Sequence, residues 1–278
     1  MAAPVPAAAA AAAATHPKNT KQNVKILMLH GFTQSGPLFH AKTRALEKLL
    51  TKVLSPLSLT PQLIYPTAPN RLVLQDIPGY VPSGGDHVHD HDDNYQPDTW
   101  AWWRRDDASG TYTLLEEGMT TIAHAIAEAD GIDGICGFSQ GAAAAGLVAA
   151  ALEPTRVVPS PERQEEGGGK EAAAAARWVR RLRKANRGRA VRFAVSYSGF
   201  WAPVASLQFL YEPRIQTPML HYLGSLDTVV EEGRSRALVD RCVSAMTVVH
   251  PGGHHVPVSK EWVMPLAGFI KQHVQDVV

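Results

Sequence analysis

The chain has 278 residues, a formal net charge of +1 and 45% apolar side chains, which is typical of a soluble globular protein with one or two domains. The near-zero charge excludes the overall basicity of a nucleic-acid-binding protein. No run reaches the roughly 18 to 20 strongly apolar residues that a membrane-spanning helix needs. Two cysteines, Cys136 and Cys242, are too few for a disulfide framework or a multi-cysteine zinc site, so a reducing compartment is favoured.

The first 22 residues form an alanine-rich segment of low complexity. Pro4 and Pro6 interrupt its helical propensity, and it has no bulky apolar side chain for docking. It also lacks the basic n-region of a secretory signal and the arginines of a mitochondrial presequence. We therefore predict a disordered tail over 1–22, followed by a single domain over 23–278.

From Val24 onward, short apolar runs alternate with stretches of helical spacing. Strands are predicted at 24–30, 61–66, 131–138, 191–198, 218–224 and 245–250. Helices are predicted at 37–54, 114–130, 141–152, 231–242 and 260–275. This alternation predicts an α/β fold with a mainly parallel sheet and helices on both faces.

A polar, irregular stretch at 81–98 interrupts this alternation. Within it, residues 86–93 alternate histidines with aspartates and valine. Such side chains are common metal ligands, but a polar loop lacks the rigid support that a metal site needs. We therefore expect no metal at this loop.

A second, charged stretch at 153–189 is longer than its connection requires, and we interpret it as an insertion. It is expected to be flexible at 158–169 and to form a basic helix over about 170–186. The apolar face around Trp178 looks thin, which favours a solvated helix or a flap over the rest of the protein. Contact of 170–189 with an anionic membrane or a protein partner stays an alternative.

The motif Gly137-Phe138-Ser139-Gln140-Gly141 follows a predicted strand and precedes a predicted helix, as in a G-x-S-x-G nucleophile elbow. Such a turn crowds the chain at the positions of its glycines, lifts the serine above the sheet edge and points a helix N-terminus at it. We interpret Ser139 as a nucleophile, the alternative being a glycine-rich turn with an incidental serine.

A serine nucleophile needs a base that is held by an acid, and the expected chain order is Ser, Asp or Glu, His. Asp227 follows one predicted strand and is favoured over Asp240, which lies in a predicted helix. His254 follows the last predicted strand after two glycines and is favoured over His250 and His255. Asp227 and His254 are therefore the predicted acid and base.

An oxyanion hole needs two backbone N–H groups. One is expected from Gln140, directly after the nucleophile, and the other from Phe32, in the loop after the first strand. His30 ends that strand, and we expect it to brace the loop by hydrogen bonding rather than to take part in the chemistry.

Four motifs occur together along the chain, in the order LHGFTQSG, GFSQGAA, GSLDTVV and HPGGHHVP. With them the sequence resembles the FSH family of serine hydrolases, small α/β-hydrolases related to the ovarian-cancer-associated serine hydrolases. The resemblance covers about 23–276 apart from the insertion. It implies an α/β-hydrolase fold with Ser139 as nucleophile, Asp227 as acid, His254 as base and Gly31-Phe32 in the oxyanion loop.

Two further segments bear on the pocket that this resemblance implies. The turn at 67–70 reads TAPN, with Asn70 where the family usually has histidine, which affects the expected pocket shape rather than the triad. The segment WAWW at 100–103 resembles the family's tryptophan-rich block. Trp102 and Trp103 are therefore expected to line or cover the acyl pocket, the alternative being aromatic packing in the core.

The resemblance implies hydrolysis of a carboxylic ester or thioester with an apolar acyl group, through an acyl-enzyme intermediate. A small-molecule substrate, no cofactor, no nucleic acid and a cytoplasmic or nuclear location are expected. An acyl-protein thioesterase type of hydrolase, which shares the GFSQG elbow, and a non-catalytic binding module are the alternatives.

Overall fold

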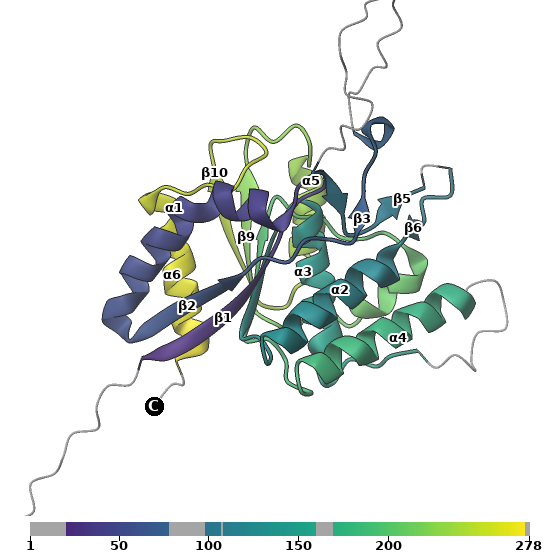
Figure 1. Ribbon diagram of the computed structural model, residues 1–278, viewed down its shortest axis with the longest axis horizontal. Helices are drawn as coiled ribbons and strands as arrows, with labels where there is room; N and C mark the ends of the chain where they lie inside the picture. Colours follow the sequence, from purple (N-terminus) through teal and green to yellow (C-terminus); the bar gives the residue numbers. More distant parts are fainter. Residues whose placement is uncertain (1–20, 78–97, 107, 160–168, 276–278) are drawn as a thin grey trace, which may run out of the picture.

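Six strands form the central sheet in the order β10-β9-β8-β7-β1-β2, and all neighbours run parallel (Figure 1). The strands are β1 (Gln22–Leu29), β2 (Leu59–Ile64), β7 (Gly134–Phe138), β8 (Phe193–Tyr197), β9 (Met219–Gly224) and β10 (Ala245–His250). The structure is a computed structural model that describes residues 21–77, 98–106, 108–159 and 169–275.

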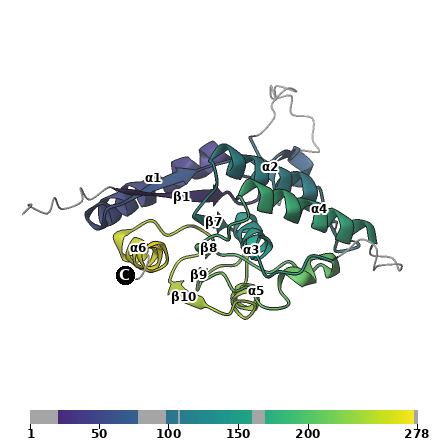
Figure 2. The ribbon, with the colours of Figure 1, turned by 90° about the horizontal axis from the view of Figure 1, so that it is seen from below.

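Helices cover both faces of this sheet (Figures 1 and 2). On one face, α1 (Gly36–Leu54) packs against α6 (Lys260–Val274), and both bury their apolar stripes on the sheet. The other face carries α2 (Leu115–Glu128), α3 (Gln140–Leu152), α4 (Gly169–Ala185) and α5 (Glu232–Val239). The strands β7, β8 and β9 are buried along their whole length because both of their faces are covered.

The predicted α/β fold is confirmed: each expected strand and helix is present, and most bounds differ by only one to three residues. The small-residue helix α3 has every residue buried. Its alanines leave little side chain between the helix and the sheet, so α3 lies close to β7 and β8. Among the described residues, no helix is both long and apolar enough to cross a bilayer.

The helix α4 differs from the expected solvated helix or flap. Its side chains of Ala176, Trp178, Val179 and Leu182 are at most 1% exposed, and α4 packs against α2 and α3. The apolar face of α4 is wider than its bulky residues alone suggested, because alanines are also part of it. The helix is therefore a core element, whereas the bounds of the tail and of the 153–189 insertion stay predictions, since 1–20 and 160–168 lie outside the described residues.

Several short elements were not predicted, among them two antiparallel strand pairs that position the tryptophan block. The pair β3 (Asn70–Arg71) and β4 (Trp100–Ala101) and the pair β5 (Arg104–Arg105) and β6 (Tyr112–Thr113) are antiparallel. The remaining elements are the 3-10 helices η1 (Ser55–Leu57), η2 (Leu74–Asp76) and η4 (Ala205–Leu210). A bridge between Gln34 and Trp100 joins the block to the loop after β1. The histidine-rich segment 86–93 lies outside the described residues.

Candidate active site

Three predicted site residues each follow a strand of the central sheet. Ser139 comes directly after β7, Asp227 follows β9, and His254 follows β10. Because all six strands run parallel, these chain segments emerge at the same edge. The carboxyl ends of the strands are where open α/β sheets bind their ligands.

The elbow around Ser139 is built by close backbone approach. Ser139 has φ +53° and ψ −116°, a conformation that non-glycine residues seldom adopt, and its N–H donates to the Tyr197 carbonyl at 2.9 Å. A Cβ at Gly137 would overlap the backbone of Gly141, and a Cβ at Gly141 would overlap the carbonyl of Leu29. The two flanking glycines are therefore required by space, as the motif predicted.

Asp227 and His254, the predicted acid and base, form a hydrogen-bonded pair. Asp227 Oδ2 lies 2.8 Å from His254 Nδ1, and Oδ1 accepts the N–H groups of Val229 at 3.0 Å and Val230 at 2.9 Å. The side chain of Asp227 is 2% exposed and that of His254 is 17% exposed. The imidazole also packs on the Phe138 ring, with centroids 4.7 Å apart, next to Ser139.

These contacts decide the ionisation of Asp227. Burial by itself raises the pKa of this carboxyl, but the hydrogen bonds from His254 and from the Val230 N–H outweigh burial and hold the pKa below its ordinary value. The carboxylate is therefore ionised near neutral pH. It can only accept at His254 Nδ1, so the proton of neutral His254 lies on Nδ1, and Nε2 keeps its lone pair.

The competing candidates for the acid and the base are not part of the Asp227–His254 pair. His250 is buried at the end of β10, and its Nδ1 accepts the Gly252 N–H at 3.2 Å. His255 is exposed and contacts the edge of the His250 ring, while Asp240 is the exposed residue that ends α5. Of the candidates that the sequence left open, the structure brings together Asp227 and His254.

The two expected oxyanion donors are free to bind a ligand. Within the described residues, neither the Phe32 N–H nor the Gln140 N–H has a hydrogen-bond acceptor, and both residues line the pocket that contains Ser139. The Gln140 N–H is also at the N-terminus of α3, where the helix dipole favours negative charge. These two groups are suited to an oxyanion.

His30 braces the oxyanion loop, as expected. Its Nδ1 donates to the Gly31 carbonyl at 2.8 Å, and its Nε2 accepts the Ala68 N–H at 3.0 Å. Burial lowers the pKa of His30 to about 4, so the ring is neutral and can serve as donor at one nitrogen and acceptor at the other. The ring is wholly buried and acts on the loop.

The side chain of Gln140 has a role that the sequence did not reveal. Its Oε1 accepts the Trp102 N–H at 2.8 Å, and its Nε2 donates to the Trp103 carbonyl at 2.9 Å. Asn70, in the TAPN turn, donates to the carbonyls of Trp102 and Leu114, both at 3.2 Å. These amides hold the tryptophan block on the elbow. The sequence signal that could have pointed to this role is the primary amide side chain directly after Ser139.

Of the two tryptophans that were expected to line the pocket, one does and the other does not. Trp103 lines it and stacks on Tyr112, with centroids 5.2 Å apart. Trp102 is wholly buried behind it, next to the His30 ring, and its Nε1 donates to the His30 carbonyl at 2.9 Å. The expectation is corrected for Trp102, because its ring is buried in the core and only Trp103 of the two lines the pocket.

The pocket at Ser139 has a volume of about 660 Å³. Its walls combine apolar, aromatic and charged side chains. They are Phe32, Leu72, Gln75, Asp76, Trp103, Arg104, Arg105, Asp106, Tyr112, Thr113, Gln140, Phe200, Val229, Val230 and Arg234. Among the described residues, no group of three His, Cys, Asp or Glu side chains is placed to hold a metal ion.

The fold and this site define an α/β-hydrolase. The family model described as Serine hydrolase (FSH1) matches residues 19–266, and the chain belongs to this family. Family of serine hydrolases 3 of Saccharomyces cerevisiae is 30% identical over 252 residues, covering 89% of this chain and 83% of the relative. Esterase OVCA2 of Danio rerio is 27% identical over 260 residues, covering 90% and 97%.

A relative from Schizosaccharomyces pombe named dihydrofolate reductase is 29% identical over 241 residues. This chain spans only 44% of that relative's length. Among solved structures, Arabidopsis thaliana SOBER1 has a TM-score of 0.54 at 19% identity and covers 91% of this chain and 100% of its own. Zea mays acyl-protein thioesterase 2 has a TM-score of 0.52 at 19% identity and covers 94% and 97%. Both show the fold alone.

Proposed function

We propose that the protein hydrolyses carboxylic ester or thioester bonds of small acyl substrates, with Ser139 as nucleophile, His254 as base and Asp227 as the acid that orients it. The observation that carries this proposal is the 2.8 Å contact between Asp227 Oδ2 and His254 Nδ1, with the second carboxylate oxygen held by two backbone N–H groups. Such an anchored pair supports general base catalysis beside a serine that lines a pocket.

In the first half of the reaction, His254 Nε2 takes the proton of the Ser139 hydroxyl as its Oγ attacks the acyl carbon. The carbonyl oxygen becomes an oxyanion, which the N–H groups of Phe32 and Gln140 bind. The tetrahedral intermediate collapses, and the bond to the leaving oxygen or sulfur breaks. His254 gives the proton to this leaving group, and an acyl ester remains on Ser139.

In the second half, water repeats the same steps. His254 removes a proton from the water as its oxygen attacks the acyl ester, and the N–H groups of Phe32 and Gln140 again bind the developing charge. The bond to Ser139 Oγ breaks, His254 returns the proton to that oxygen, and the carboxylic acid leaves. Throughout, Asp227 stabilises the imidazolium of His254 and fixes its orientation.

The pocket walls support an apolar acyl group. The side chains of Leu72, Phe200 and Val230 line the pocket together with the rings of Trp103 and Tyr112. Apolar walls with a few polar groups are typical of small-molecule sites, and about 300–1,000 Å³ is their usual range. The same steps serve an ester and a thioester, so the leaving group has to be determined with substrates.

Labelling with a fluorophosphonate probe tests the nucleophile. The wild type should be labelled, Ser139→Ala should not, and Ser206→Ala should be labelled like the wild type because Ser206 lies in η4, outside this pocket. Labelling that survives Ser139→Ala would refute the assignment. An unlabelled wild type would support the non-catalytic binding module instead.

Replacement of Asp227 by asparagine tests the acid. The amide no longer favours the Nδ1–H tautomer of His254, so kcat should fall by about 10⁴-fold while the fold is retained. Asp240→Asn is the matched control and should keep the wild-type rate. The measurement is hydrolysis of p-nitrophenyl octanoate and of an octanoyl thioester by folded variants. A rate within tenfold of the wild type would move the acid to another residue.

A further inference from the structure

Three arginines line the pocket at Ser139, and they differ in their partners. Arg104 forms an ion pair with Asp76, in which Nη2 lies 2.8 Å from Oδ2 and Nη1 lies 3.1 Å from Oδ1. Within the described part of the chain, no carboxylate pairs with Arg105 or Arg234. With respect to these described residues, the two guanidinium groups keep their donors for a ligand.

Arg105 and Arg234 come from different elements, β5 and α5. The Arg234 guanidinium lies over the Phe200 ring, 4.7 Å from its centroid, and stacking of this kind orients the planar group while its N–H donors stay free. Both cations act on the Tyr112 phenol. Burial raises the pKa of Tyr112, and the charges of Arg105 and Arg234 oppose this rise.

The acids near these arginines have other partners. Asp76 is engaged by Arg104 and accepts the Val73 N–H. Asp106 Oδ1 accepts both the N–H and the hydroxyl of Ser109, at 2.7 and 2.8 Å, within its own turn. With Asp76 neutralised by Arg104, the charges left in the pocket lining are the two cations of Arg105 and Arg234 and the one carboxylate of Asp106, an excess of positive charge.

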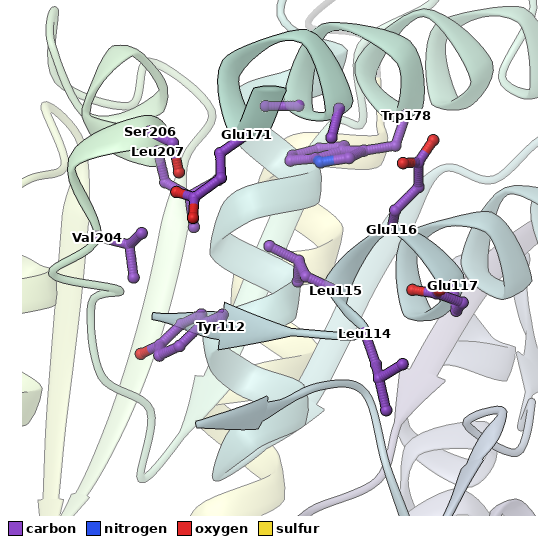
Figure 3. Close-up of a pocket in the computed structure, with 12 residues that line it drawn as sticks. Tyr112, Leu114, Leu115, Glu116, Glu117, Glu171, Trp178, Val204, Ser206 and Leu207 are labelled. Carbon is purple, nitrogen blue, oxygen red and sulfur yellow. The ribbon is translucent and has the colours of Figure 1, made fainter. Parts of the chain in front are cut away.

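Tyr112 also lines a second hollow, whose charged side chains are three glutamates (Figure 3). It has a volume of about 210 Å³, and its apolar floor includes Leu115 and Trp178. The carboxylates of Glu116, Glu117 and Glu171 surround it. Glu116 is paired with Arg177, with Oε2 2.8 Å from Nη2, whereas Glu117 and Glu171 have no cationic partner among the described residues. An anion is therefore disfavoured in this hollow relative to the arginine side of Tyr112.

We infer that Arg105 and Arg234 form a subsite for an anionic group of the substrate, a carboxylate or a phosphate. This inference rests on the proposed function, because the anionic group is held while Ser139 attacks the acyl carbon. The anion can belong to the acyl chain, as in a dicarboxylic monoester, or to the leaving group, as in an acyl phosphopantetheine thioester. Both sources present the same chemistry to a guanidinium.

Matched substrates distinguish the two sources. For the acyl chain, the mono-p-nitrophenyl ester of glutaric acid is compared with its neutral methyl diester. For the leaving group, butyryl coenzyme A is compared with the neutral butyryl thioester of N-acetylcysteamine. The variants are Arg105→Gln and Arg234→Gln, with Arg236→Gln as control because Arg236 of α5 pairs with exposed Glu232 and does not line the pocket.

For at least one anionic substrate, each pocket variant should lower kcat/KM about tenfold, mainly through a higher KM. For the neutral substrate of each pair, kcat/KM of the pocket variants should stay within twofold of the wild type. The control Arg236→Gln should leave kcat/KM unchanged for the anionic and the neutral substrate. The loss should shrink as salt rises, because salt screens exposed charges. If the glutarate pair responds, the anion belongs to the acyl chain. If the butyryl thioester pair responds, it belongs to the leaving group.

Equal losses on the charged and neutral substrates, or no loss on either anionic substrate, would overturn the subsite. This outcome differs from failure of the proposed function. If the wild type neither hydrolyses the neutral substrates nor reacts with the fluorophosphonate at Ser139, the catalytic assignment fails. If it does both and shows no charge discrimination, only the subsite fails.

Discussion

Replacement of Gln140 by methionine should destabilise the protein through two backbone groups. The amide of Gln140 accepts the N–H of Trp102 and donates to the carbonyl of Trp103, at 2.8 and 2.9 Å, and all three residues are buried. Methionine keeps the length of the side chain but supplies neither group. An orphaned buried donor or acceptor costs about 1–3 kcal/mol, so the free energy of unfolding should fall by about 2–6 kcal/mol.

The assay is urea unfolding followed by tryptophan fluorescence, with Gln62→Met as the control. Gln62 is exposed on β2, so its replacement should change the free energy of unfolding by less than about 0.5 kcal/mol. Because Trp103 lines the pocket, Gln140→Met should also raise KM. A loss below about 0.5 kcal/mol for Gln140→Met would refute the reasoning.

The variant Gln140→Glu sharpens the same test. At neutral pH its carboxylate can still accept the Trp102 N–H, but it faces the carbonyl oxygen of Trp103 without a donor. A protonated carboxyl can donate to that carbonyl, and its pKa in the folded protein should be raised. The stability deficit relative to the wild type should therefore shrink as pH falls from 7 to 5. A deficit independent of pH would contradict this geometry.

Two further predictions concern stability. Burial lowers the pKa of His30 and of His221 to about 4, so the unfolded chain binds protons first as pH falls below about 6.5. The stability that they contribute is present above 6.5 and is lost toward pH 4, by about 2 kcal/mol per histidine between pH 6.5 and 5. Urea unfolding at pH 7, 6 and 5 measures this loss, and a flat profile would contradict it. Trp178→Ala should cost about 3–5 kcal/mol in the same assay, whereas a loss under 1 kcal/mol would restore the flap interpretation of α4.

Much of the fold could be predicted from the sequence, because its signals are local. The strand predicted at 218–224 is β9 (Met219–Gly224), which is buried along its whole length. The buried strands of a parallel sheet are short, continuous apolar runs. The helix over 170–186 was also predicted, but its burial was not. A moderately apolar face is exposed or buried according to what packs against it, and here that partner is α2.

The candidate site likewise combines features that the local sequence specifies with features that depend on tertiary packing. The elbow at Ser139 carries its own signature, because close backbone approach at Gly137 and Gly141 excludes any side chain. The sequence favoured His254 over His250 and His255, but its 2.8 Å contact with Asp227, 27 residues earlier in the chain, is a tertiary feature that no local pattern specifies.

The strand–helix alternation, the elbow and the order of the candidate triad residues follow from the amino-acid sequence, because each depends on neighbours along the chain. The tertiary structure was needed to show which tryptophan lines the pocket, which amide holds it, and which arginines there have no carboxylate partner among the described residues. Those features depend on segments that meet only after the sheet has formed. No local pattern specifies which side chains from β5, β6 and α5 then converge around Tyr112.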